Sequence, residues 1–258
     1  MRAVILAAGR GSRLNGHVTD APKALLELGG LSLVKRQIRA LRAEGIRDVA
    51  VVVGCEADLV RRHCGPGITY VENQRFASTN SLYSLWMART LLMDGFVVLN
   101  CDVLFHPQLL ADLLTARHEA AALVAYREPD AAPYGPEEMK VKVRSGRVVD
   151  MSKTMDPAEA DAENVGLLRF DRTAAPALVA ALDAIVERGG HREWAPRAFA
   201  AFAQTRPLHA VGTRGFPWTE IDFPEDYEYA RREVLPALDP DERPGATGSW
   251  PAVGAASR

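Results

Sequence analysis

The sequence predicts an α/β protein with a Rossmann-like three-layer αβα arrangement, in which helices cover both faces of a mostly parallel, mixed sheet. Two observations lead to this fold class. Residues 4–7, 49–53 and 96–99 are continuous apolar runs, which are typical of strands buried on both faces. Segments with helical spacing of apolar residues separate these runs, and parallel strands need such crossover connections. We therefore expect right-handed βαβ units in the first half of the chain.

The first half of the chain also contains signals for the ends of helices. Ser32 is placed to cap a helix that Gly45 ends, and Asp94 with Gly95 ends a later one. The expected strands are residues 4–7, 49–53, 68–71, 96–99 and 121–126, and the expected helices are residues 32–44, 56–64, 82–93 and 107–116.

The pattern changes after Arg127. Residues 139–144 and 147–151 alternate in polarity around Ser145-Gly146, which predicts a β-hairpin. The remaining expected elements are strands at residues 165–170 and 218–221 and helices at residues 174–188 and 224–235.

These elements suggest one domain followed by a tail. We expect residues 1–235 to form that domain, with an inserted hairpin, a candidate lid, at about residues 128–163. Residues 236–258 are rich in Pro, Gly, Ala and Ser and lack periodicity, so we expect them to be disordered.

The bulk composition limits the partners of the chain. With 31 Lys and Arg against 33 Asp and Glu, the formal net charge is −2, which gives no electrostatic case for nucleic acid or an anionic membrane. No apolar run has the length of a transmembrane helix or of a signal-peptide core. The 3 cysteines lack metal-type spacing and suit reduced thiols. We expect a cytoplasmic protein, and whether it forms a homo-oligomer stays open.

The most informative motif follows the first expected strand. Residues 6–14 read Leu-Ala-Ala-Gly-Arg-Gly-Ser-Arg-Leu, and Lys23 comes further on. Gly9 and Gly11 let the backbone approach a phosphate closely, and the N–H groups of such a loop form an anion nest. Arg13 and Lys23 add donors for phosphate oxygens.

The spacing of this loop excludes two common phosphate motifs. No Lys follows Gly16, as a P-loop requires, and Leu14 stands where the dinucleotide fingerprint needs its third glycine. The structural alternative is a plain glycine-rich turn between a strand and a helix.

Two carboxylates follow expected strands, and ligands of open α/β sheets bind outside the carboxyl ends of the strands. Asp102 follows the strand at residues 96–99, and Asp222 follows the strand at residues 218–221. Together they can hold Mg²⁺ against a triphosphate. Either one alone can instead cap the turn or helix after it, so the pair beside the glycine loop is what favours the metal.

A polar segment joins the strand at residues 68–71 to the next helix. Asn73, Thr79, Asn80 and Ser81 supply amides and hydroxyls that can hydrogen-bond a nucleobase or a ribose. Thr79 or Asn80 is also an ordinary helix cap, and the N-terminus of that helix would favour anions. Both roles can coexist.

Basic residues gather around the expected hairpin. Lys140 and Lys142 share one face of a strand, and Arg127 and Lys153 flank it. The functional interpretation is that one or two of these residues hold the phosphate of an acceptor, and the alternative is a solvated face. Glu220 is a further candidate for binding the acceptor.

These motifs together resemble bacterial nucleotidyltransferases of the sugar-phosphate nucleotidylyltransferase type, and most closely the cytidylyltransferases that act on phosphocholine or on phosphonates. The resemblance spans most of residues 1–235. It rests on the N-terminal loop to Lys23, on residues 72–73 and 79–85, on the strand end at Asp102 and on residues 220–222. The string at 79–85 favours the cytidylyl branch, because sugar nucleotidylyltransferases usually carry a Gln-rich or Gly-rich segment there.

The resemblance implies Mg²⁺-dependent transfer of a cytidylyl group from CTP to a small phosphate or phosphonate, with release of pyrophosphate. Arg13 and Lys23 would act on the triphosphate, and Asp102 and Asp222 would hold the metal. The expected nucleotide-binding residues are Leu6, Ala7, Ala8, Gly9, Gly11, Ser12, Arg13, Lys23, Asn73, Thr79, Asn80 and Ser81.

The hairpin departs from the phosphocholine branch, which carries carboxylates and aromatic residues in its acceptor region. Here residues 137–142 read Glu-Glu-Met-Lys-Val-Lys, and lysines disfavour a cationic headgroup. We therefore expect an anionic or neutral acceptor, such as a phosphonate or a compound with a carboxylate, rather than phosphocholine. The alternatives are a sugar-1-phosphate enzyme that uses UTP, dTTP or GTP and a non-catalytic nucleotide-sensing subunit of the same fold.

Overall fold

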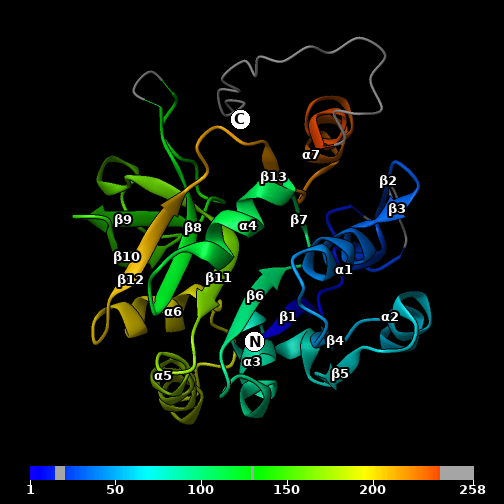
Figure 1. The fold of residues 1–258 in the computed structure, drawn as a ribbon, viewed down its shortest axis with the longest axis horizontal. Helices are drawn as coiled ribbons and strands as arrows, with labels where there is room; N and C mark the ends of the chain where they lie inside the picture. The colour runs from blue at the N-terminus through cyan, green and yellow to red at the C-terminus, as the bar shows by residue number, and fades with distance from the viewer. Residues whose placement is uncertain (15–20, 129–130, 239–258) are drawn as a thin grey trace.

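A nine-stranded sheet, with strand order β5-β4-β1-β6-β11-β8-β12-β10-β9, forms the centre of the molecule (Figure 1). The structure is a computed structural model, and it describes residues 1–14, 21–128 and 131–238. The sheet has two parts with different hydrogen-bonding patterns, and β11, the first strand of the second part, joins them through its pairing with β6.

The first part of the sheet is parallel throughout. The central strand β1 (Arg2–Ala7) pairs with β4 (Val49–Val53) on one side and with β6 (Phe96–Asn100) on the other, and β5 (Thr69–Glu72) lies beyond β4. All residues of β4 are buried. The apolar runs predict β1, β4 and β6 to within two residues, because a strand buried on both faces leaves a continuous apolar signature, and the partly exposed β5 lies one residue after its expected range.

The second part of the sheet is mixed and closes into a ring. β11 (Ala162–Phe170) runs antiparallel to β6 and β8 (Ala120–Tyr126), and β12 (Leu208–Gly212) runs parallel to β8. The hairpin of β9 (Lys140–Arg144) and β10 (Arg147–Ser152) then pairs antiparallel with β12 through β10, and with β11 through β9.

Two expectations change as a result. The sheet is parallel throughout in its first part, whereas in the second part only β12 and β8 run parallel, so a mostly parallel sheet describes the first part alone. The predicted hairpin forms, but it is built into the sheet instead of standing apart as an insertion. The sequence pattern does not reveal this closure, because the short strand β12 carries no alternation strong enough to predict it.

Strand β11 changes partners halfway along its length. Its first residues, Ala162 and Glu163, pair with β9, whereas its last residues pair with β6. The register with β8 shifts between Asn164 and Leu168, and Gly166 there has φ +85°. A Cβ at Gly166 would lie 2.9 Å from the side-chain nitrogen of Asn100. The irregularity therefore lets the backbone of β11 approach the side chain of Asn100, at the end of β6, closely.

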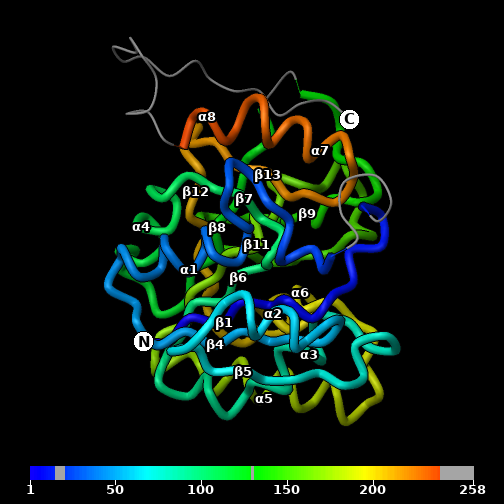
Figure 2. Tube along the Cα trace, turned by 90° about the vertical axis from the view of Figure 1, so that its right-hand side faces the viewer, coloured from blue at the N-terminus to red at the C-terminus, as the bar shows by residue number. Residues whose placement is uncertain are grey.

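Helices cover both faces of the sheet, as predicted. Residues Ala3 and Ile5 of β1 pack with α1 (Leu33–Ala43), α2 (Ala57–Cys64) and α4 (Pro107–Thr115) on one face. Val4 and Leu6 pack with α3 (Ser81–Met87), α5 (Ala175–Glu187) and α6 (Pro196–Ala203) on the other. Figure 2 shows α3 and α5 together on one side of β1 and β4.

A smaller third cluster of apolar residues lies beside the sheet. It joins the hairpin of β2 (Glu27–Leu28) and β3 (Leu31–Ser32) to the C-terminal helices α7 (Pro224–Tyr229) and α8 (Leu235–Leu238) and the turn of π-helix between them (Ala230–Val234). The helix expected at residues 224–235 thus exists and continues to Leu238. Residues 236–238, the start of the tail predicted to be disordered, are therefore helical, and the rest of that tail, residues 239–258, lies outside the described residues.

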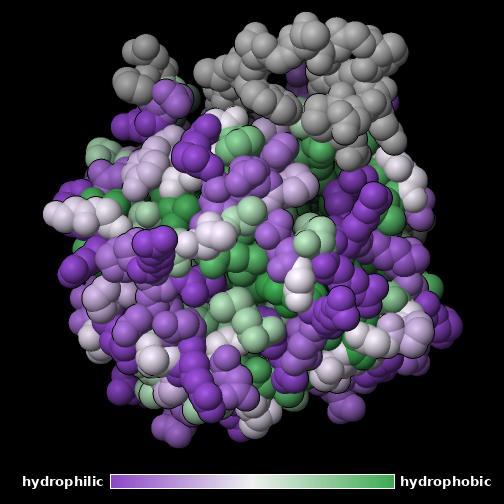
Figure 3. Space-filling model, viewed as in Figure 1, coloured by the Kyte–Doolittle hydropathy of each residue, from purple (hydrophilic) through white to green (hydrophobic). Residues whose placement is uncertain are grey.

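No helix in the described part of the chain is long and apolar enough to span a membrane. On the face seen in Figure 3, hydrophilic residues surround smaller groups of apolar ones. Among the large apolar side chains, those of Trp194 and Tyr126 are notably exposed.

The irregularity in β11 leads to a stability prediction. Gly166→Ala adds a Cβ near Asn100 in a left-handed backbone conformation, whereas Gly189→Ala meets the same strain (φ +87°) with nothing within 4 Å. We expect Gly166→Ala to lower the free energy of unfolding in urea by about 1 kcal/mol more than Gly189→Ala does, because overlap adds to strain. Equal losses in the two variants would show that the Asn100 side chain moves aside without lowering the free energy of unfolding.

Candidate functional site

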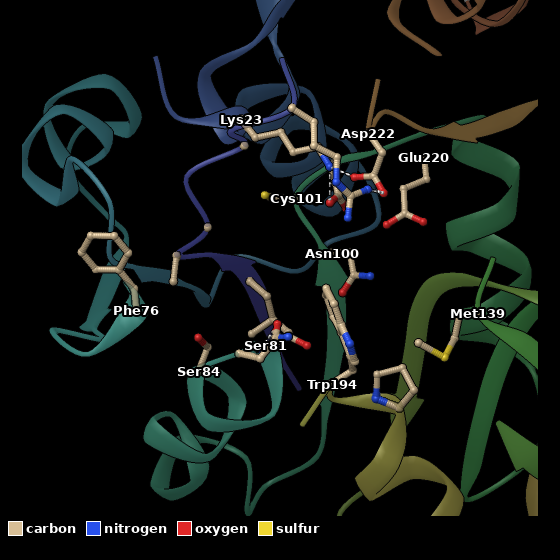
Figure 4. A pocket seen from close by; sticks show the side chains of 18 of the residues that line it. Lys23, Phe76, Ser81, Ser84, Asn100, Cys101, Met139, Trp194, Glu220 and Asp222 are labelled. Atoms are coloured by element: carbon tan, nitrogen blue, oxygen red, sulfur yellow. Dashed lines mark hydrogen bonds and ion pairs between the residues drawn. The ribbon is translucent and has the colours of Figure 1, made fainter. Parts of the chain in front are cut away.

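A cavity of about 300 Å³ opens at the carboxyl ends of β1 and β6. In Figure 4, Lys23 and Asp222 lie at one end of it, and Trp194 stands between Ser81 on one side and Met139 on the other. The residues that line it are Leu6, Ala8, Gly9, Gly11, Ser12, Arg13, Lys23, Phe76, Thr79, Asn80, Ser81, Ser84, Asn100, Cys101, Asp102, Met139, Lys153, Asn164, Trp194, Pro196, Glu220 and Asp222.

The glycine loop follows β1 directly and forms one wall of the cavity. Gly11 has φ +69°, and a Cβ there would lie 2.8 Å from the Cβ of Lys23, so only glycine allows the loop to pack against Lys23. The backbone N–H of Leu14 donates to the carbonyl of Gly11 at 3.0 Å, and the Leu14 side chain is fully buried. The loop is thus fixed at its far end by a turn and an apolar anchor.

Lys23 is buried and joins two carboxylates. It begins a short 3-10 helix (Lys23–Leu25), and its ammonium donates to Asp102 at 2.8 Å and to Asp222. Burial by itself would lower the pKa of Lys23, but the negative charges of Asp102, Asp222 and Glu220 outweigh it and raise the pKa above its usual value. The lysine therefore stays positively charged.

The backbone brings the carboxylates together through a pair of short strands. β7 (Val103–Phe105) starts just after Asp102, and β13 (Trp218–Glu220) ends just before Asp222. The two strands are antiparallel, and the N–H of Ile221 donates to the carbonyl of Asp102 at 3.0 Å. Antiparallel pairing therefore puts the start of one strand, and its aspartate, beside the end of the other.

Asp102, Glu220 and Asp222 could hold a divalent metal ion. One oxygen from each lies within 4.8 Å of the others, and Oδ1 of Asp102 is buried with no hydrogen-bond partner. Burial and the charges of Asp102 and Asp222 raise the pKa of Glu220 to about 8. Burial would also raise the pKa of Asp222, but Lys23 and Arg13 keep it below its usual value. The crowding of three carboxyl groups and the unpartnered oxygen of Asp102 fit a hard cation with oxygen ligands.

Arg13 reaches over the same end of the cavity. Its guanidinium nitrogen Nη1 lies 3.1 Å from Oδ2 of Asp222 and 3.3 Å from Oε2 of Glu137, and its charge lies over the ring of Phe223 at 4.9 Å. The N-terminal turn of α7 is stabilised by Asp226, which accepts from the N–H groups of Asp222 and Phe223. Asp222 is therefore not the cap of that helix.

The polar segment before α3 divides into lining and supporting residues. Thr79, Asn80 and Ser81 line the cavity, whereas Asn73 is buried behind them and donates to the hydroxyls of Thr79 and Ser84, each at 3.0 Å. Asn80 caps α3 by accepting from the N–H of Ser81. The capping role is confirmed.

A loop from the second half of the chain occupies the N-terminus of α3. The N–H groups of Asn80 and Leu82 donate to the carbonyls of His191 and Glu193, and the N–H of Ala195 donates to Ser81 Oγ at 2.9 Å. Because these amides are used, the expected attraction of this helix end for anions is weakened. The same contacts hold Trp194 over the cavity.

The expected acceptor-binding residues are only partly brought together. Lys153 and Glu220 line the cavity. Lys140 is buried and donates to the carbonyls of Gly135 and Glu138, and Lys142 pairs with Glu159 at 2.9 Å.

Arg127 lies at the exposed end of β8, where its N–H bonds to Asp161. None of Lys140, Lys142 and Arg127 lines the cavity, and both lysines are paired elsewhere, so their placement does not support a role in binding the acceptor. Among the expected nucleotide-binding residues, Ala7 packs instead in the core on the opposite face of the sheet.

Several residues that line the cavity are not among the site residues that the sequence predicts. They are Phe76, Ser84, Asn100, Cys101, Met139, Asn164, Trp194 and Pro196. Asn100 stands at the end of an expected strand and so could have been found, whereas Asn164 and Trp194 arrive through the closure of the ring, which has no local signal.

The fold and the site together define an α/β nucleotidyltransferase, because a glycine loop and a buried lysine face a carboxylate cluster beside the carboxyl ends of the parallel strands β1 and β6. The chain belongs to the MobA-like NTP transferase domain family, whose sequence profile matches residues 3–195.

Known relatives agree with this class. The chain is 33% identical over 238 residues to the bifunctional IPC transferase and DIPP synthase of Rubrobacter xylanophilus. This alignment covers 90% of this chain and 52% of that protein. It is 36% identical over 132 residues to the CMP-5′-(3-aminopropyl)phosphonate synthase of Streptomyces rubellomurinus, over 49% of this chain and 21% of that protein. The chain thus spans about half the length of the first relative and a smaller share, 21%, of the length of the second.

A solved structure supports the fold. The inositol-1-phosphate CTP transferase of T. maritima superposes with a TM-score of 0.74 at 21% identity, over 92% of this chain and 96% of that one. At this level of identity the likeness concerns the fold alone.

The carboxylate cluster leads to a prediction about metal binding. Mg²⁺ should raise the melting temperature of the protein. An ion that binds only the native state and is present at a concentration of about 100 times its Kd adds about 2.7 kcal/mol to the free energy of unfolding. Asp222→Asn should lose most of this gain, and Asp48→Asn, whose carboxylate pairs with Arg2 far from the cavity, should retain it. An equal gain in both variants, measured by thermal unfolding, would place the ion elsewhere.

Proposed function

We propose that this protein transfers a cytidylyl group from CTP to a small phosphate or phosphonate and releases pyrophosphate. The observation that carries the proposal is the buried contact of Lys23 with Asp102 and Asp222 beneath the glycine loop. This arrangement offers a cation for phosphate oxygens and carboxylates for a metal in one place, and it suits a reaction at a triphosphate.

The reaction follows from this arrangement. An anionic oxygen of the acceptor attacks the α-phosphorus in line, a new P–O bond forms, and the bond to the bridging oxygen of the β-phosphate breaks, so that pyrophosphate leaves. The attacking oxygen needs no general base. Lys23 and Arg13 stabilise the charge on the phosphates, and backbone N–H groups of the loop position them. Mg²⁺, held by Asp102 and Asp222, would neutralise further charge on the triphosphate.

The choice of CTP rests on two supports. Thr79, Asn80 and Ser81 line the cavity, and Figure 4 shows Ser81 on the side away from Asp222 and Glu220. In addition, the name of one relative in sequence contains CMP, and the name of one protein of similar structure contains CTP. Discrimination against other bases would come from hydrogen bonds of these side chains, since such bonds discriminate more sharply than apolar contacts.

The acceptor is proposed to bind on the side of Lys153. Its ammonium lies over the ring of Trp194 at 4.8 Å, and both residues line the cavity with Glu220. A phosphate or phosphonate suits Lys153. The expected preference for an acceptor with an additional negative charge is weaker here than the sequence suggested, because Lys140 and Lys142 lie elsewhere and Glu220 adds a carboxyl group.

Kinetics of variants test the roles of the charged residues. Asp102→Ala and Asp222→Ala should each abolish turnover while the fold survives, and Lys23→Ala should lower kcat/KM by about 100-fold or more, because an electrostatic partner of the transition state is lost. Asp48→Ala and Lys35→Ala, both outside the cavity, serve as matched controls. Near-normal turnover of both aspartate variants at saturating Mg²⁺ would refute the metal assignment.

A substrate panel tests the reaction itself. The protein is incubated with Mg²⁺ and each of CTP, UTP, dTTP, GTP and ATP, together with small phosphates and phosphonates, and pyrophosphate release is measured. We expect release with CTP. Release with another nucleotide and a sugar 1-phosphate would favour a sugar nucleotidylyltransferase, and nucleotide binding without any release would favour a nucleotide-sensing subunit.

A further inference from the structure

Glu137 connects the two sides of the cavity. Its Oε2 lies 3.3 Å from Nη1 of Arg13 and 3.4 Å from Nζ of Lys153. Arg13 belongs to the glycine loop and Lys153 follows β10, so one carboxylate oxygen contacts a cation from each side. Both cations line the cavity, and the proposed function gives one to each substrate.

The segment that carries Glu137 is firmly attached to the protein. The fully buried ammonium of Lys140 donates to the carbonyl of Gly135 at 2.8 Å and to that of Glu138 at 3.3 Å, on either side of Glu137 in the chain. The hydroxyl of Tyr134 also donates to the carbonyl of Ala125 at 3.2 Å. Burying a charged lysine is costly unless it gains such partners, so the lysine specifies the path of this segment.

Each of the two cations also has a second contact that limits its movement. Arg13 pairs with Asp222 and lies over Phe223, and Lys153 lies over Trp194. A cation held from two directions has a defined position, even though an exposed ion pair adds little to stability. Glu137 therefore affects the distance between the two cations more than it affects the stability of the fold.

We propose that Glu137 is a positioning residue that fixes the spacing of Arg13 and Lys153, and through them the spacing of the donor triphosphate and the acceptor phosphate. This inference rests on the proposed function. Arginine has five N–H donors and lysine three, so each cation keeps donors for a phosphate while one contacts Glu137. Because in-line attack depends on the distance between the reacting atoms, loss of this bridge acts on the chemical step.

The first test compares Glu137→Gln with wild type and with Glu159→Gln, a matched control that removes the same charge from an ion pair with Lys142. We expect Glu137→Gln to lower kcat by about 10-fold or more with little change in either KM, because small misplacements of reacting groups are costly. Glu159→Gln should behave as wild type. Unchanged kcat with lower KM for both substrates would mean that Glu137 only competes with the phosphates, and would overturn the proposal.

The second test does not depend on turnover. Calorimetry measures the Kd of methylphosphonate with and without a CTP analogue in which CH₂ replaces the oxygen between the α- and β-phosphorus atoms. If Glu137 links the two cations, the analogue should tighten methylphosphonate binding in wild type and in Glu159→Gln, and the ratio of the two Kd values should approach one in Glu137→Gln. No such coupling in wild type, or the same coupling in Glu137→Gln, would overturn the inference. A wild-type protein that shows coupling but no transfer in the substrate panel would instead count against the proposed function.

Discussion

The ammonium of Lys23 between the carboxylates of Asp102 and Asp222 is the contact on which the rest of the site depends. It joins three parts of the chain that are far apart in sequence, namely the 3-10 helix after the glycine loop, the end of β6 and the end of β13. Ionised groups with so little access to water are stable only when they are paired, and removing one partner would leave like charges together. The same need explains why Gly11 is required, since a larger residue would push Lys23 away.

The division of the cavity into two sides follows from the architecture of the sheet. The parallel strands deliver the glycine loop and Asp102 at their carboxyl ends, as in other open α/β sheets. The ring delivers Met139, Lys153 and Asn164, which lie on or next to its strands. A constant chemistry of phosphate and metal can thus be combined with a variable set of acceptor contacts, because different secondary structures supply the two.

The sequence was most informative where a residue acts through its local backbone. The strand at β1, the cap at Ser32 and the aspartates at strand ends all follow from short-range rules, and each lies where the pattern predicts. It was least informative where a long-range closure decides the outcome. The alternation around Lys140 predicts a strand and a shared face, but it does not contain the pairing of β9 with β11 that buries this lysine. Trp194 was also missed as a lining residue, because backbone bonds to α3 are what hold it there.

The pairing of β11 with strands of both parts of the sheet has a mechanical consequence. Many two-substrate enzymes close by hinge rotation of one lobe against another. Here such a rotation would have to break the hydrogen bonds of β11 with β6 or with β8, since the same strand pairs with both. The two parts of the sheet therefore form one frame, and the loops at residues 131–139 and 190–196, which hold Glu137 and Trp194, are fixed to that frame by hydrogen bonds. Exchange of these loops between relatives could alter acceptor choice without disturbing the frame.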